Sequence, residues 1–225
     1  MARPFLKWAG GKGKILDTLN SYLPDVPRNG FNYFDPFLGG GALFFELEQK
    51  GKIKHATLSD INPELILCYR VIRDNVESLI KDLKIIKKRF PKRDKTREKF
   101  YYSIRDKWNS KLCTNVDSIS NYKASKRVAM TIFMNKTCFN GLFRVNSKGR
   151  FNVPYGFYKN PSIVNEENLT SASIALKNVQ IMCQDYTKFE FENESDNFVY
   201  FDPPYRPLTG SSSFTAYSKS GFNDD

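Results

Sequence analysis

The sequence predicts an α/β fold: a parallel sheet with packed helices, interrupted by a mainly helical insertion. Four short apolar runs have the length and composition of buried strands, and they cover residues 31–34, 56–59, 179–182 and 198–201. A turn signal and a helical pattern follow each of the first two runs, an alternation typical of parallel sheets. From Glu64 to about Lys159 this alternation lapses, and apolar residues recur at helical spacing. We therefore expect a second, smaller unit to be inserted after the second strand.

Composition limits the classes of protein to which this chain can belong. Its 225 residues leave room for one α/β core and a smaller inserted region. The formal net charge of +11 favours a polyanionic partner. No apolar run reaches the roughly 20 residues of a membrane span. The four cysteines stand singly, which argues against a disulfide framework and a zinc site. We expect a cytoplasmic protein that holds no metal.

A glycine-rich turn and an acidic residue follow the first two predicted strands. Residues 35–42 read DPFLGGGA, and glycines there let the backbone approach a ligand at a helix N-terminus. Their spacing differs from the dinucleotide fingerprint, so a pyrophosphate is not indicated. Asp60 ends the second strand, where an acid can accept hydrogen bonds from ribose hydroxyls. A simple turn acid is the alternative, but Asp60 and the glycines together indicate a nucleoside cofactor such as S-adenosylmethionine.

The N-terminal run of residues 5–12, FLKWAGGK, combines aromatic rings, paired glycines and a lysine before a helical pattern. We expect it to cradle a charged small molecule, and a plain turn before a helix is the alternative. It is not a P-loop, because the motif's spacing is absent and Gly13 follows Lys12.

The last predicted strand ends in Asp202-Pro203-Pro204-Tyr205. The prolines fix the backbone and leave their carbonyls free to accept hydrogen bonds, and Tyr205 offers a ring face. An amino group on a planar heterocycle needs such a site, with two acceptors and an aromatic platform. A rigid turn with a capping aspartate is the alternative.

The insertion carries two notable segments. Residues 84–99 are densely basic, which fits a solvated helix face and a phosphate-contacting face equally well. Residues 137–154 have turn signals at Asn140-Gly141 and at residues 147–149, which predict a hairpin or a pair of loops. Their polar side chains suit base edges and phosphates, and Phe139 or Leu142 could wedge into a base stack. A purely structural hairpin is the alternative.

Taken together and in this order, the motifs resemble those of the Dam-type adenine-N6 DNA methyltransferases of bacteria and phages, the GATC-modifying branch in particular. The motifs are FLKWAGGK (5–12), DPFLGGG (35–41), DIN (60–62), NGLFR (140–144) and DPPY (202–205). The resemblance implies a Rossmann-like S-adenosylmethionine-dependent methyltransferase sheet from residues 1–63 and 160–225, with a target-recognition insertion from residues 64–159. It implies double-stranded DNA as partner, a cognate restriction endonuclease as a further one, and a bacterial cell or phage-infected host as location.

The resemblance also implies roles for individual residues. The residues expected to receive a flipped-out target adenine are Asp202, Pro203 and Tyr205. The residues expected around S-adenosylmethionine are Trp8, Lys12, Phe37, Gly39, Gly41, Asp60, Asp185 and Asp202. The residues expected at the DNA are Lys7, Phe139, Asn140, Leu142, Arg144 and Pro154.

Members of this family usually continue for several tens of residues beyond a loop similar to residues 211–217. We therefore expect the C-terminal part of the sheet to be missing and a sheet edge to be left open. Two other classes stay open at this point. One is a catalytically inactive DNA-binding remnant, and the other is a methyltransferase acting on RNA or another amine.

Overall fold

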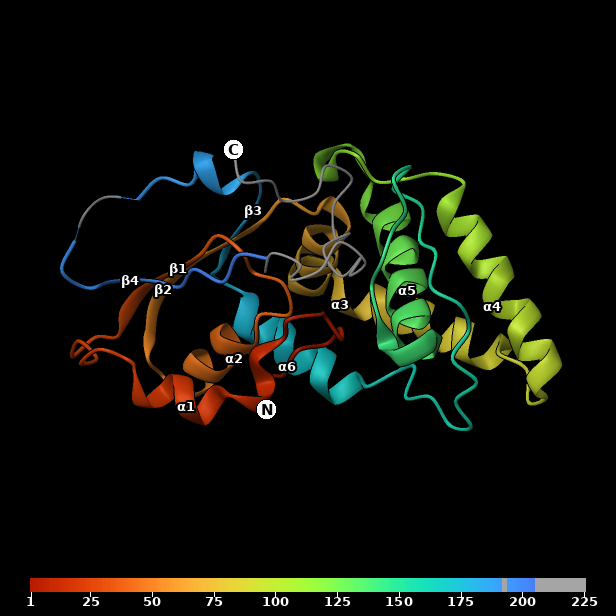
Figure 1. Ribbon diagram of the computed structural model, residues 1–225, viewed down its shortest axis with the longest axis horizontal. Helices are drawn as coiled ribbons and strands as arrows, with labels where there is room; N and C mark the ends of the chain where they lie inside the picture. Colours follow the sequence, from red (N-terminus) through yellow and green to blue (C-terminus); the bar gives the residue numbers. More distant parts are fainter. Residues whose placement is uncertain (192–193, 205–225) are drawn as a thin grey trace, which may run out of the picture.

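The computed structural model describes residues 1–191 and 194–204, and among these residues the sheet has four parallel strands (Figure 1). The strands are β1 (Phe31–Asp35), β2 (Ile53–Asp60), β3 (Gln180–Cys183) and β4 (Asn197–Val199). Each overlaps one of the predicted strands. The predicted α/β class and the parallel sheet are thus confirmed.

The order of the strands across the sheet is β3-β2-β1-β4. The chain steps outward in one direction from β1 to β3 and then returns to place β4 on the other side of β1. In sheets of this kind a crevice opens outside the carboxyl ends of the two strands where the direction reverses, and ligands bind there. In this protein those strands are β1 and β4, so Asp35 and Asp202 both approach the crevice.

The last strand differs from its prediction. A buried strand over residues 198–201 is expected, but β4 ends at Val199 and its residues are only half-buried, while Phe201 is 56% exposed. β4 pairs with β1 on one side, and no described residue pairs with its other side. The apolar run marks the position of the strand correctly, but not its burial.

Helices and short 3-10 turns connect the strands. Before β1 lie η1 (Lys12–Lys14) and α1 (Leu16–Ser21), and α2 (Ala42–Gln49) follows β1. Between β2 and β3 lie α3 (Pro63–Arg89), α4 (Asp94–Asn109), η2 (Val116–Ser118), α5 (Asn121–Thr137), η3 (Phe139–Gly141) and α6 (Glu166–Leu176). The last turn is η4 (Tyr186–Lys188). α3 begins with a regular N-cap, because the Asn62 side chain accepts hydrogen bonds from the Glu64 and Leu65 amides and Pro63 follows it.

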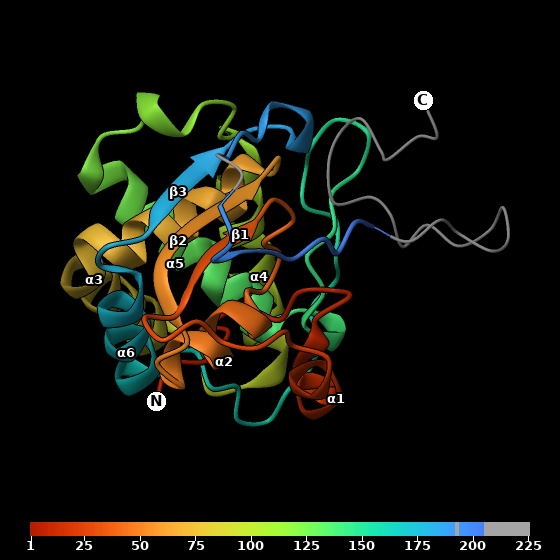
Figure 2. The ribbon, with the colours of Figure 1, turned by 90° about the vertical axis from the view of Figure 1, so that its left-hand side faces the viewer.

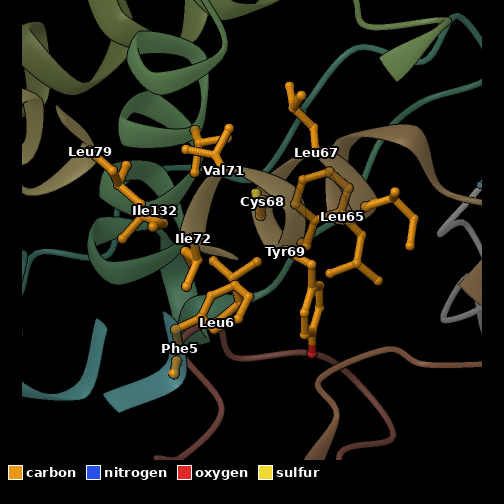
Figure 3. Close-up of a cluster of buried hydrophobic side chains, with 14 of the residues drawn as sticks. Phe5, Leu6, Leu65, Leu67, Cys68, Tyr69, Val71, Ile72, Leu79 and Ile132 are labelled. Atoms are coloured by element: carbon orange, nitrogen blue, oxygen red, sulfur yellow. The ribbon is translucent and has the colours of Figure 1, made fainter. Parts of the chain in front are cut away.

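The long helix α3 joins the sheet to the helices beyond it (Figures 1 and 2). It packs on β2 and β3 and also on α5 and α6. Its apolar side chains form a continuous core with Phe5 and Leu6 of the N-terminal segment and with Ile132 of α5 (Figure 3). Asn75 departs from helical geometry, with φ −149° and ψ 41°, so α3 consists of two helical stretches. The sheet and the helical region therefore share one core.

The segment after α5 folds back on itself, as the turn signals predict. Isolated antiparallel bridges pair Cys138 with Tyr155 and Val145 with Phe151. The backbone closes further through hydrogen bonds from the Asn152 amide to the Arg144 carbonyl and from the Phe139 amide to the Pro154 carbonyl. We call residues 138–156 the recognition loop, after the role that the resemblance implies for some of them.

Across residues 1–191 and 194–204, no helix is both long and apolar enough to cross a membrane. In the same residues, no three acidic, histidine or cysteine side chains gather closely enough to hold a metal ion.

Candidate active site

Asp202 lies just beyond β4 and meets Lys12 at the carboxyl edge of the sheet. The Lys12 ammonium donates to both carboxylate oxygens, at 2.6 and 2.5 Å, and to the Gly10 carbonyl oxygen at 2.9 Å. Both side chains of this ion pair are largely shielded, with 14% of Lys12 and 21% of Asp202 exposed. Two residues that are 190 positions apart, both predicted at the cofactor, are thus brought together.

Asp60 ends β2 and closes the glycine turn. Its carboxylate accepts hydrogen bonds from the Gly39 amide at 3.1 Å and from the Asn62 amide at 2.9 Å. Burial raises the pKa of the Asp60 carboxyl to about 6, although these backbone donors act in the opposite direction. With the Ile61 amide, three backbone donors act on the two oxygens, and a carboxylate can accept about four hydrogen bonds. Asp60 therefore retains capacity to accept hydrogen bonds from a ligand.

The glycine turn is packed tightly by two aromatic residues. Gly41 adopts a left-handed conformation, with φ 65°, and a Cβ there would lie 2.6 Å from the Tyr69 hydroxyl. A Cβ on Gly39 would lie 3.1 Å from the Trp8 ring. Trp8 in turn stacks on Phe143 of the recognition loop, with ring centroids 4.9 Å apart. The turn, the N-terminal run and the recognition loop thus meet around Trp8.

Phe37 and Asp185 lie on neighbouring segments of the same edge. The Phe37 ring lies 5.1 Å from the ring of Tyr186 and 6.1 Å from that of Phe201. The Asp185 carboxylate caps η4 by accepting from the Thr187 amide and hydroxyl, and these bonds lower its pKa. Tyr186 directly follows Asp185 in the chain. Its ring contact with Phe37 therefore brings together the segments that carry the two predicted residues, Phe37 and Asp185.

Asp35, a buried acid at this edge, was not identified as a site residue from the sequence. Asp35 ends β1 and is 2% exposed; it accepts from the Tyr33 hydroxyl at 3.1 Å and from the Phe37 amide at 3.2 Å. Burial, with a smaller contribution from the charges of Asp60 and Asp202, raises the pKa of the Asp35 carboxyl from 3.8 to about 7. Its position at a strand end before Pro36 carries the same signal as Asp60 and Asp202.

The raised pKa predicts how stability depends on pH. Between about pH 4 and pH 7 the folded protein keeps the Asp35 proton that the unfolded chain releases. The stabilisation from this group is therefore complete below about pH 4 and is lost as the pH rises to about 7, by at most about 4 kcal/mol. The Asp35→Asn variant lacks this loss, so its melting temperature relative to the unmodified protein should rise over that range. A constant difference between the two melting curves across pH 4.5–8 would contradict the assignment.

The predicted DNA-contacting residues all lie on the recognition loop or beside it. Phe139 is 52% exposed, Asn140 is exposed with a left-handed φ of 55°, and Leu142 is half-buried against the core. The Arg144 guanidinium donates to the Asn152 side-chain oxygen at 2.9 Å, and Pro154 is exposed.

Lys7 lies against the same loop from the N-terminal side. Its side chain is exposed, its ammonium lies 5.9 Å from the centre of the Tyr158 ring, and Gly141 packs directly on its methylene groups.

The structure describes the DPPY motif only as far as Pro204. Pro203 is described and exposed, whereas Tyr205 lies outside the described residues, as does the loop of residues 211–217.

The basic run of residues 84–99 crosses from the end of α3 into α4, and most of its described lysines and arginines are exposed. That exposure agrees with both interpretations of the run.

The strand order, the acids at the ends of β1, β2 and β4, and the glycine turn define an α/β protein whose polar groups gather at the reversal point of a parallel sheet, the place where such sheets bind ligands. The comparison with known families is more specific. Residues 8–225 match the family described as D12 class N6 adenine-specific DNA methyltransferase, and the chain belongs to this family. It is therefore an enzyme that methylates adenine in DNA. This membership decides against a methyltransferase acting on RNA or another amine.

Individual relatives agree. The chain is 49% identical to the type II methyltransferase M.MjaIII of Methanocaldococcus jannaschii over 99% of its own length and 76% of the relative's. It is 42% identical to the type II methyltransferase M1.LlaDCHI of Lactococcus lactis subsp. cremoris, covering 98% of this chain and 72% of that one. It is 34% identical to the DNA adenine methylase of Haemophilus influenzae, covering 98% and 70%. The resemblance to Dam-type enzymes is confirmed.

Proposed function

We propose that this enzyme transfers a methyl group from S-adenosylmethionine to N6 of adenine in duplex DNA, within the sequence GATC. The observation that carries the proposal is the convergence of Lys12, Asp60 and Asp202 on one edge of the sheet. The type II names of two relatives further support a restriction endonuclease acting on the same site as a partner.

The residues at this edge fit S-adenosylmethionine by their chemistry. Asp60 has acceptor capacity left for ribose hydroxyls. Lys12 and Asp202 supply opposite charges that match the carboxylate and ammonium ends of the methionine part. The residues that would hold the group are Trp8, Lys12, Phe37, Gly39, Gly41, Asp60, Asp185 and Asp202. When bound, the group supplies the sulfonium methyl.

The end of β4 is suited to hold the acceptor base. A target adenine inside the duplex is out of reach, so it leaves the stack before reaction. We assign the Asp202 carboxylate and the Pro203 carbonyl as acceptors for its amino group, and Tyr205 as its stacking platform. Lys12 orients the carboxylate, whose oxygens keep lone pairs for a second donor. Fixing the amino group in this way aligns its nitrogen lone pair for methyl transfer.

The target sequence is read, in this proposal, by Lys7 and the recognition loop. The side chains involved are Lys7, Phe139, Asn140, Leu142, Arg144 and Pro154. The exposure of Phe139 suits a side chain that wedges between bases, and the guanidinium of Arg144 suits a guanine edge. We assign residues 64–159 to target recognition and residues 1–63 and 160–225 to catalysis.

Methyl transfer to defined duplexes tests the proposal. Labelled methyl from S-adenosylmethionine is offered to a GATC duplex, to the same duplex with both target adenines already N6-methylated, and to a duplex with one base pair of the site changed. We expect label on the first duplex only. Label on all three would refute GATC specificity, and label on none would refute the proposed reaction for this chain.

A further inference from the structure

Asn135, in the last turn of α5, is a buried amide whose side chain bonds to two other segments. It is 1% exposed. Its Oδ1 accepts from the Lys7 amide at 2.9 Å, and its Nδ2 donates to the Lys7 carbonyl and to the Gly141 carbonyl, both at 2.9 Å. One side chain therefore ties the N-terminal run to the recognition loop.

The two tied segments also fit each other closely. Gly141 has φ 66°, and a Cβ there would collide with Lys7 Cδ and lie 3.3 Å from the Asn135 carbonyl oxygen. From Lys7 the chain continues through Trp8 to Lys12, which holds Asp202. The position of Lys7 is thus fixed relative to the recognition loop on one side and to the active-site edge on the other.

We propose that Asn135 is a positioning residue that fixes the position of Lys7 relative to the recognition loop, here called their register, so that both read the same target sequence. Asn135 does not need to contact DNA for this role, because it acts through the backbone of Lys7 and Gly141. The inference rests on the proposed function, in which Lys7 and the recognition loop contact the bases.

The chemistry of the site requires an amide. Lys7 presents a donor and an acceptor, and Gly141 presents an acceptor, so the side chain must accept one bond and donate two. Aspartate keeps the acceptor but offers at most one donor, and leaves a carboxyl oxygen 2.9 Å from a carbonyl oxygen. The Asn135→Asp substitution therefore loosens the register while keeping the volume of the side chain.

The chain offers a matched control in Asn168 of α6. Its Oδ1 accepts from the Arg3 amide at 2.9 Å and its Nδ2 donates to the Arg3 carbonyl at 3.0 Å. This is the same clamp on the same N-terminal segment, four residues earlier, but within the described part of the chain the Asn168 side chain makes no hydrogen bond to the recognition loop. The Asn168→Asp variant thus reports what loosening the segment alone does.

The experiment measures sequence discrimination. The sequence preferred by the unmodified enzyme is first identified on unmethylated plasmid DNA. Then kcat/KM is measured on a duplex with that sequence and on duplexes with single changed base pairs, for Asn135→Asp, Asn168→Asp and Gly141→Ala. Misfolding lowers both rates together and leaves their ratio unchanged, whereas a lost register changes the ratio.

We expect the discrimination ratio to fall about tenfold or more in Asn135→Asp and Gly141→Ala, the size of one lost specific base contact. In Asn168→Asp it should stay within about twofold of the original. An unchanged ratio in a folded Asn135→Asp protein overturns the inference, and if that variant does not fold, Gly141→Ala decides in the same way. An unmodified enzyme that methylates no adenine refutes the proposed function instead.

Discussion

Replacing Asp202 by alanine is expected to reduce methyl transfer to the GATC duplex about 100-fold or more, while DNA affinity changes little. The carboxylate lies at the reversal point of the sheet, just past β4, and is held by the Lys12 ammonium. Alanine removes the acceptor that we assign to the adenine amino group, and it leaves Lys12 without this carboxylate. The recognition loop is untouched, so DNA binding should persist. Single-turnover methyl transfer and a fluorescence-anisotropy titration with the duplex measure the two quantities.

A matched control separates chemistry from folding. Asp196 precedes β4 at its amino end, whereas Asp202 follows it at the carboxyl end. The Asp196→Asn variant alters an acid beside the same strand, away from the crevice, and should retain turnover within about twofold, since surface substitutions usually have small effects. Near-normal turnover in Asp202→Ala would refute the assignment. Equal losses in both variants would attribute the effect to the strand rather than to the carboxylate.

The strands and their acidic ends could be predicted because both signals are local. An apolar run of four or five residues marks a strand, and the residue after it lies at the sheet edge whatever the topology is. The order β3-β2-β1-β4 could not be read in the same way, because the chain between β2 and β3 runs through the whole helical region. The Rossmann-like arrangement of the sheet is implied by the resemblance to a known family and not by the local pattern.

The contacts that build the site were less accessible to sequence reasoning. Lys12 and Asp202 were each predicted at the cofactor, but their ion pair spans 190 positions. The sequence places Asp35 within the glycine turn and gives no sign that it is more deeply buried than the half-buried Asp60. Asn135 lies in a helical pattern, where a polar residue is normally solvated, but in the fold it is 1% exposed and bonds to Lys7 and Gly141. Long-range polar contacts of this kind leave no periodic signal.

The second large effect is expected at a buried ion pair between α3 and α5. Arg127 and Glu64 are 7% and 6% exposed, and the Arg127 Nε donates to the Glu64 carboxylate at 2.8 Å. Arg127 also donates to the Trp108 carbonyl at 3.2 Å and lies over the Trp108 ring. The Arg127→Met substitution leaves the Glu64 carboxylate buried without its counter-charge, which should lower the free energy of unfolding by about 3–5 kcal/mol. Urea denaturation followed by circular dichroism measures this loss.

The double variant Glu64→Gln/Arg127→Met tests the physical reason. It removes both charges, and glutamine can still accept from the Cys113 amide, which bonds to Glu64 at 2.9 Å. Because most of the cost comes from one unpaired buried charge, the double variant should be more stable than Arg127→Met alone.

An exposed pair provides the comparison. Lys84 and Glu166 form an ion pair in which both side chains are 55% exposed, so Lys84→Met should change the free energy of unfolding by less than about 1 kcal/mol. A loss in Arg127→Met as small as that of Lys84→Met would show that the buried pair does not hold α5 to α3.

The position of Glu64 gives the pair a wider consequence, since α3 begins just after Asp60 and is capped by Asn62. A stable start of α3 therefore also keeps Asp60 in place at the edge of the sheet, so a loosened pair should weaken the proposed binding of S-adenosylmethionine together with stability.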